Sequence, residues 1–117
     1  MLNEQFTGDI ELDAPRVYIA GPMSGLPNAN RSAFNAASVM VIRGDISEIG
    51  TGIPLNPAIL PYGLSQAEYM QICMQMVMIA NVIYVLTGWE SSLRAQAEIA
   101  LAKKLGKRII YQDCETD

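Results

Sequence analysis

The stretch NVIYVLTGWESSLRAQAEIALAKKLGKRIIY, residues 81–111, decides the fold. It opens with a β-branched, apolar run that is typical of a buried strand. After a short loop, Ser91 or Ser92 can cap a helix, which Gly106 closes behind lysines whose charge suits the helix dipole. The stretch therefore predicts a strand at 81–86, a loop at 87–90, a helix running to Leu105 and a strand at 108–111.

The segments before this stretch repeat the same alternation. An apolar run ends at the turn-forming pair Gly21-Pro22, and Asn30 can cap the free amides of the helix that follows. Ser65, with Glu68 three residues later, forms a capping-box pattern. We therefore expect a strand at 16–20, a loop at 21–30, a helix from Asn30 to Ile42, a strand at 53–55, a proline-stiffened loop at 56–64 and a helix from Gln66 to Ala80.

Alternating strands and helices predict an α/β protein, in which right-handed crossovers build a parallel sheet of four to five strands with helices on both faces. A chain of 117 residues supports a single domain. We expect an acidic arm at 1–14, the domain at 15–112 and an acidic tail at 113–117. Because ligands of such sheets bind beyond the carboxyl ends of the strands, the loops at 21–30, 56–64 and 87–92 are the candidate site loops.

The composition excludes several classes of function. Eight basic and twelve acidic residues give a net charge of −4, which argues against direct nucleic-acid binding. The chain has no histidine, so histidine metal sites and Ser–His or Cys–His dyads are excluded. Acid–base or nucleophilic work must come from carboxylates, Cys, Ser, Tyr or Lys.

The two cysteines and the apolar segments indicate a cytoplasmic protein. Cys73 and Cys114 form no spaced cluster and can pair only if the fold joins them, so we expect free thiols in a reducing compartment. The first residues lack the pattern of a signal peptide. Gln75 and Asn81 interrupt the longest apolar stretch, so we expect no membrane span.

The expected helix from Gln66 to Ala80 is apolar nearly all round. One interpretation is a deeply buried core helix. The other, which we favour in so small a chain, is that one apolar stripe packs on a second copy and makes a homodimer or larger oligomer. The two stripes consist of Met70, Cys73, Met74, Val77 and Met78, and of Ile72, Met76 and Ile79.

Glu98 and its surroundings are open to two interpretations. Glu98 is either an exposed helix residue paired with Arg94, or a site carboxylate that a ligand approaches past small neighbours. Trp89 either stacks on a base or sugar or covers the edge of the sheet. Arg31 either solvates the surface or contacts an acidic ligand. The small neighbours of Glu98 are Ala95, Ala97 and Ala102.

Together these features resemble the nucleoside 2-deoxyribosyltransferase superfamily over residues 16–111, and most closely a small branch often found in phages. The resemblance implies a flavodoxin- or Rossmann-like sheet, obligate oligomers with sites near subunit boundaries, and no metal or redox cofactor. It implies cleavage of the N-glycosidic bond of deoxynucleosides or their 5′-monophosphates, with Glu98 attacking C1′ of the sugar. The motifs that carry it are YIAGPMSG at 18–25, Asn30-Arg31, Phe34-Asn35, GWESS at 88–92 and Glu98.

Three positions refine the resemblance. Ser92 stands where the monophosphate N-hydrolases carry a phosphate-contacting serine and transferases carry an aspartate. Cys73 stands where both branches place an acidic residue, and Arg94 where a glycine is expected. These two departures leave a catalytically degenerate nucleotide-binding or protein-interaction module as the alternative, unless Glu90 supplies the missing acid. The candidate substrate contacts are Gly21, Pro22, Met23, Ser24, Arg31, Trp89, Glu90 and Ser92, with Glu98 as the catalytic residue.

Overall fold

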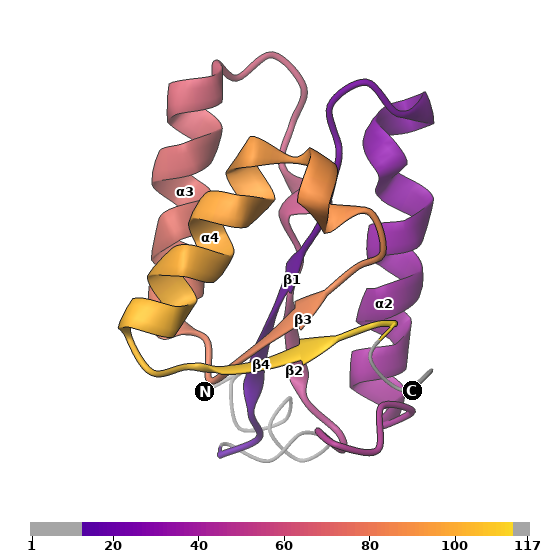
Figure 1. Cartoon of the computed structure of the whole chain (residues 1–117). Coiled ribbons are helices and arrows are strands. Elements are labelled where there is room, and N and C mark those ends of the chain that lie inside the picture. Colours follow the sequence, from indigo (N-terminus) through magenta and orange to yellow (C-terminus); the bar gives the residue numbers. More distant parts are fainter. Residues whose placement is uncertain (1–12, 114–117) are drawn as a thin grey trace, which may run out of the picture.

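The computed structural model describes residues 13–113 and contains a parallel sheet in the order β2-β1-β3-β4 (Figure 1). The predicted α/β fold is therefore confirmed, with four strands in the described part of the chain. The expected arm and tail, and Cys114, lie largely or wholly outside it. The strands are β1 at Arg16–Ala20, β2 at Ile53–Leu55, β3 at Val82–Val85 and β4 at Arg108–Tyr111.

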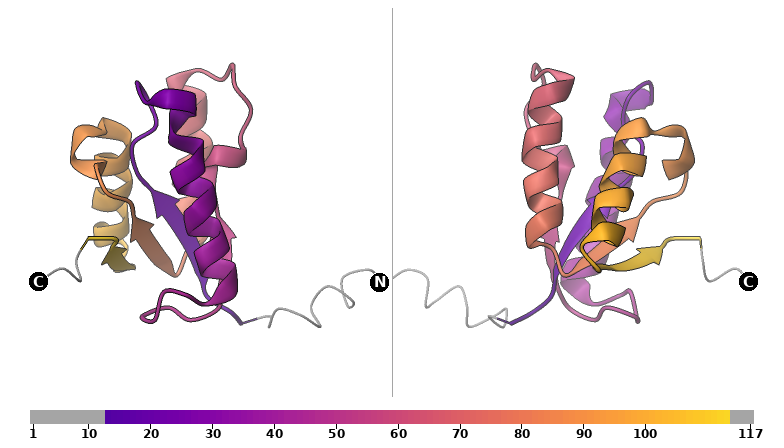
Figure 2. Two further views of the ribbon diagram at one scale, coloured as in Figure 1. Left: turned by 90° about the vertical axis from the view of Figure 1, so that its right-hand side faces the viewer. Right: turned by 60° about the vertical axis from the view of Figure 1, so that its left-hand side comes forward.

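The helices cover both faces of the sheet, as Figure 2 shows. The helix α2, Arg31–Arg43, packs its buried side chains on one face. The helices α3, Gln66–Ile79, and α4, Leu93–Lys104, lie against each other on the other face. Short 3-10 turns precede or follow the strands at Pro27–Asn30, Pro57–Ile59 and Trp89–Ser91.

The caps of the two helices α3 and α4 form as predicted. Ser65 accepts from the Glu68 amide, and the Glu68 carboxylate accepts from the Ser65 amide, which completes the capping box. Ser92 accepts from the Ala95 amide and begins α4. Of the two serines proposed for this role, Ser92 is therefore the cap.

The predicted capping role of Asn30 is wrong. Asn30 directly precedes α2, but its φ of 59° is left-handed, whereas a capping side chain needs an extended backbone. Its amide donates instead to the Pro22 carbonyl at 2.9 Å. The left-handed run Asn28–Asn30 thus folds the loop after β1 back onto its own beginning.

The carboxyl ends of β1 and β3 lie side by side at the upper edge of the sheet in Figure 1. Gly21 belongs to this packing, because a Cβ on it would lie 2.9 Å from the Leu86 Cβ. The loops that follow β1, β2 and β3 therefore gather at one edge, as the parallel topology requires.

The apolar faces of α3 have different surroundings. Cys73 and Val77 are buried against the sheet, while Ile72, Met78 and Ile79 are exposed in the single chain. The wholly buried interpretation is therefore wrong, and the exposed side chains come from both predicted stripes, since Met78 belongs to the first and Met76 of the second packs against the core. Within residues 13–113 no helix has the length and apolarity that crossing a membrane requires.

Candidate active site

Glu98 is the one acidic residue buried in the described part of the chain. It lies in the second turn of α4 with 0% of its surface exposed, so the exposed interpretation is wrong. Tyr18, in the middle of β1, donates from its hydroxyl to Glu98 Oε2 at 2.8 Å. Arg94, one turn earlier on α4, brings its Nε to 3.5 Å from the same oxygen, so the predicted pairing is present. The buried Glu98 carboxyl is thus held by one contact from β1 and one from α4.

Burial sets the ionisation of Glu98. It raises the pKa of this carboxyl from the ordinary value of 4.5 to about 7, against the opposing effects of Arg94 and the Tyr18 hydrogen bond. The pKa of Tyr18 is raised well above its usual value, by burial first and then by Glu98, so its hydroxyl remains a donor. Glu98 Oε1 has no hydrogen-bond partner within residues 13–113. Strongly shifted, incompletely satisfied carboxyls of this kind are typical of functional sites.

Cys73 adjoins the same cluster from α3. It is fully buried, and burial raises the pKa of its thiol, while a hydrogen bond with Tyr18 acts in the opposite direction. This is the position where the sequence resemblance expects an acidic residue. A neutral thiol thus contacts the Tyr18–Glu98 pair at neutral pH.

Two adjoining hollows, of about 190 and 340 Å³, open beside the cluster at the carboxyl edge of the sheet. Both are bounded by the loop after β1, by the start of α3 and by Arg94. Five of the predicted contacts lie here, so residues far apart in sequence are brought together. Pro22 and Ser92 line the larger hollow, Arg31 the smaller, and Met23 and Ser24 both.

Arg31 is braced rather than free. Its two terminal nitrogens donate to the carbonyls of Ala58 and Leu60, and its guanidinium lies 4.3 Å from the centre of the Tyr62 ring. These contacts hold the loop after β2 against the start of α2. Arg31 therefore places a positive charge at a fixed position on the wall of the smaller hollow.

The other predicted contacts lie elsewhere. Trp89 and Glu90 line a separate hollow of about 290 Å³ near β4, where the indole packs against Tyr111 with ring centres 5.6 Å apart. Gly21 serves the strand packing described above. Ala95 and Ala102 are buried rather than lining a ligand path, so the expected open approach past small residues is wrong for these two.

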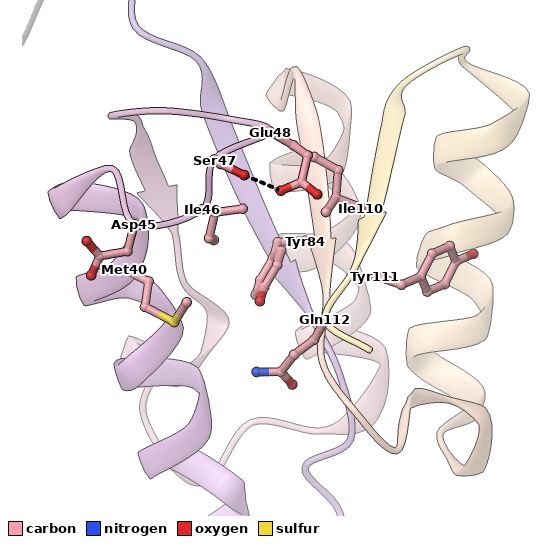
Figure 3. A pocket seen from close by; sticks show the side chains of 9 residues that line it. All are labelled: Met40, Asp45, Ile46, Ser47, Glu48, Tyr84, Ile110, Tyr111 and Gln112. Carbon is pink, nitrogen blue, oxygen red and sulfur yellow. Dashed lines mark hydrogen bonds between the residues drawn. The ribbon is translucent and has the colours of Figure 1, made fainter. Parts of the chain in front are cut away.

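A further hollow, of about 220 Å³, lies between the end of α2 and the strands β3 and β4 (Figure 3). Asp45 and Glu48 line it, together with Tyr84 of the sheet face that α2 covers. It contains no lysine or arginine among the described residues. It lies across the sheet from Glu98 and does not belong to the same site.

Sequence reasoning missed several lining residues and the partner of Glu98. Tyr18 is the first residue of the motif at 18–25, and a tyrosine in a buried strand normally needs a hydrogen-bond partner for its hydroxyl. That requirement could have predicted a buried polar partner for Tyr18. The aromatic and amide side chains of the second site loop and of α3 carried no such signal. Those that line the smaller hollow are Tyr62, Gln66 and Tyr69.

The described residues contain no group of three or more metal-ligating side chains close enough to hold an ion. What this edge of the sheet does offer is two arginines and three serine hydroxyls that line the two hollows, with a buried carboxyl beside them. Such groups can bind an anionic, polar ligand and present a carboxylate to it.

Comparison with known proteins agrees with the fold. A solved structure described as a 2-desoxiribosyltransferase from Leishmania mexicana superposes with a TM-score of 0.63 and 19% sequence identity. The match covers 83% of this chain and 63% of that one, so this chain spans under two thirds of that protein's length. The resemblance to deoxyribosyltransferases is thus confirmed at the level of the fold.

Sequence comparison gives one family. No curated protein matches the chain. The model of the family described as "Domain of unknown function (DUF4406)" matches residues 15–111. The chain therefore belongs to the DUF4406 family.

Proposed function

We propose that this protein cleaves or transfers the N-glycosidic bond of a 2′-deoxynucleoside 5′-monophosphate, with Glu98 as the nucleophile. The observation that carries this proposal is the wholly buried Glu98 carboxyl, fixed by Tyr18 next to a hollow at the carboxyl edge of the sheet. A helical carboxylate in a fold of this type has the position and chemistry to attack a sugar carbon.

The reaction proceeds in two steps. The ionised Glu98 carboxylate forms a bond to C1′ as the C1′–N bond breaks, and the base leaves with the bonding electron pair and takes up a proton from solvent. Water or a second base then attacks C1′ and releases a proton to solvent, and the bond to Glu98 breaks, which restores the carboxylate. The Tyr18 hydroxyl orients the carboxylate throughout, and its hydrogen bond keeps more of Glu98 ionised near neutral pH.

The expected substrate carries a phosphate because the hollow offers donors and positive charge. Ser92 caps α4 by accepting from the Ala95 amide and lines the larger hollow, so the N-terminus of this helix, which favours anions, lies at the wall of that hollow. Ser24 and Arg94 line both hollows, and Arg31 lines the smaller one. These groups suit a sugar phosphate better than a neutral nucleoside.

The test is release of free base, measured by chromatography from each deoxynucleoside 5′-monophosphate. Wild-type protein is expected to release base from at least one of them, and Glu98→Gln to be slower by about a thousandfold or more. Glu68→Gln, which changes an exposed carboxyl on α3, is the matched control. Base release that Glu98→Gln leaves intact would overturn the assignment.

The second candidate is a nucleotide-binding or protein-interaction module of the same fold without turnover. Cys73 in place of the expected acid favours it, because a neutral buried thiol is a poor proton donor to a leaving base. Calorimetric binding of a deoxynucleotide with no base released over long incubation would select this candidate.

Self-association through α3 forms part of the proposal. Ile72, Met78 and Ile79 are exposed on the single chain, 37%, 49% and 59% respectively, so α3 presents three large apolar side chains to its surroundings. A symmetric contact between two copies of this face would bury them. Light scattering should find a dimer or larger species for the wild type and a monomer for Ile79→Glu.

A further inference from the structure

Arg94 separates Glu98 from the hollows. Its side chain is 13% exposed and lines both of them, whereas Glu98 is 0% exposed and lines neither. The contact between the two is loose, because 3.5 Å between Nε and Oε2 is at the limit of a hydrogen bond. Arg94 Nε and Glu98 Oε1 are buried without a hydrogen-bond partner among residues 13–113. A substrate therefore reaches Glu98 only after Arg94 moves.

The two hollows are locally positive in an acidic chain. Arg94 lines both and Arg31 lines the smaller one, and none of their described lining residues is an aspartate or glutamate, although the chain carries a net charge of −4. Ser24, Ser91 and Ser92 add hydroxyl groups to the walls. The chemistry of the walls fits a phosphate group, which arginine binds with two parallel hydrogen bonds.

We propose that Arg94 selects phosphate-bearing substrates, because the phosphate draws its guanidinium away from Glu98 and uncovers the carboxylate. This inference rests on the proposed function and adds to it a residue that makes access to the nucleophile conditional on an anionic group. A neutral nucleoside leaves the pair in place and Glu98 covered.

Arg31 and Arg94 have different roles in this proposal. Arg31 is held by two backbone carbonyls and the Tyr62 ring, so it supplies constant charge. Arg94 is the candidate for movement, because its guanidinium makes no hydrogen bond to residues 13–113 and its one ion-pair partner among them is Glu98. When the guanidinium leaves, Glu98 keeps the Tyr18 hydrogen bond and loses the nearby cation. The carboxylate then becomes both accessible and more basic.

The kinetic experiment compares each deoxynucleoside 5′-monophosphate with the parent deoxynucleoside. Wild type should prefer the phosphate in kcat/KM, and Arg94→Gln should reduce that preference by about 10- to 100-fold, the range expected for one charged hydrogen-bonded contact. For the unphosphorylated nucleoside the same variant should raise kcat/KM, because the shorter, neutral side chain no longer covers Glu98. Arg94→Lys, which keeps the charge but loses the fork, should recover part of the preference.

The pH dependence of kcat/KM gives a second test, because it would not change if Arg94 had only a structural role. Arg94 lowers the pKa of Glu98, so Arg94→Gln should shift the rising limb of kcat/KM to higher pH. Arg43→Gln, an exposed arginine at the end of α2, is the charge-matched control and should leave the limb and the preference unchanged. Thermal unfolding verifies that the variants are folded.

A binding experiment separates this inference from the proposed reaction. Calorimetry on Glu98→Gln protein compares 2-deoxyribose 5-phosphate, 2-deoxyribose and inorganic phosphate, with and without Arg94→Gln. We expect the sugar phosphate to bind best and to lose about 10- to 100-fold in affinity when Arg94 is replaced. Inorganic phosphate binding as tightly as the sugar phosphate would contradict selection of a substrate.

The outcomes are distinct. Phosphate preference in binding that depends on Arg94, without any base release, would leave the role of Arg94 standing and overturn the reaction. Base release with equal rates for nucleoside and nucleotide, unchanged by Arg94→Gln, would leave the reaction standing and overturn the role of Arg94.

Discussion

The two faces of the sheet differ in what they bury. The face under α2 is filled by apolar side chains such as Phe34 and Val41. The face under α3 and α4 buries Tyr18, Cys73 and Glu98 among its apolar residues. A buried carboxyl with a raised pKa costs stability, whereas a packed phenylalanine contributes it. The comparison indicates that the α2 face stabilises the fold by apolar packing, whereas the other face combines apolar packing with the cost of a buried carboxyl, a combination that is typical of functional sites.

The largest expected effect is on the α2 face. Phe34→Ala removes a fully buried ring and should lower the free energy of unfolding by about 3–5 kcal/mol. Ile42→Ala, on the exposed side of the same helix, should change it by less than about 0.5 kcal/mol. Denaturant unfolding measures both. A decrease in unfolding free energy of less than about 1 kcal/mol for Phe34→Ala would contradict the stabilising role assigned to the α2 face.

The next effect is the pH dependence that Glu98 gives to the other face. Its pKa is 4.5 when unfolded and about 7 when folded, so the unfolded state ionises first as the pH rises. Its stabilising contribution is thus complete below pH 4.5 and lost between 4.5 and 7, by about 3 kcal/mol.

Glu98→Gln isolates this contribution, because it removes the titrating group and leaves the other carboxyls. Measured from pH 4 to 9, the unfolding free energy of the wild type should fall relative to that of the variant as the pH rises. A difference that stays flat would contradict the raised pKa and the cost assigned to this face.

A smaller effect is expected from Tyr18→Phe. The Glu98 carboxylate loses a hydrogen bond at 2.8 Å, which should cost about 1–3 kcal/mol of stability. Because that bond lowers the pKa of Glu98, the rising limb of the pH–rate profile should move to higher pH. Tyr84→Phe, on the α2 face, is the matched control and should not move the limb.

The smallest effect is expected at Cys73. Its thiol is neutral at physiological pH because burial raises its pKa. Cys73→Ala should cost about 1 kcal/mol in unfolding free energy and change base release by less than about tenfold. A larger loss of base release at unchanged stability would make Cys73 a catalytic residue and would sharpen the contrast between the faces further.

Much of the fold was predictable from local patterns. The strands and helices followed from apolar runs, from the Ser65–Glu68 capping box and from the terminating Gly106. The strand ends then placed the three site loops at one edge. Asn30 failed as a cap because its backbone conformation depends on the loop that folds back to Pro22, a contact that residue preferences do not encode.

The candidate site was predictable only in part. Glu98 and the loop residues Ser24 and Ser92 came from motif and position, and they lie at or beside the hollows. Trp89, expected there as well, packs on Tyr111, because the turn before α4 directs the indole toward the last strand. A helical pattern gives the spacing of side chains along a helix but not which neighbouring element each one faces.

The sequence by itself determined the order of elements, the parallel sheet and the edge at which ligands would bind, because apolar periodicity, caps and breakers act over a few residues. The tertiary structure decided that Glu98 is buried, that Tyr18 donates to it and that Arg94 forms an ion pair with it. Those facts depend on how α4 lies across the sheet. The Tyr18–Glu98 contact joins residues 80 positions apart, and burial, which sets the pKa, is a property of the whole packed domain.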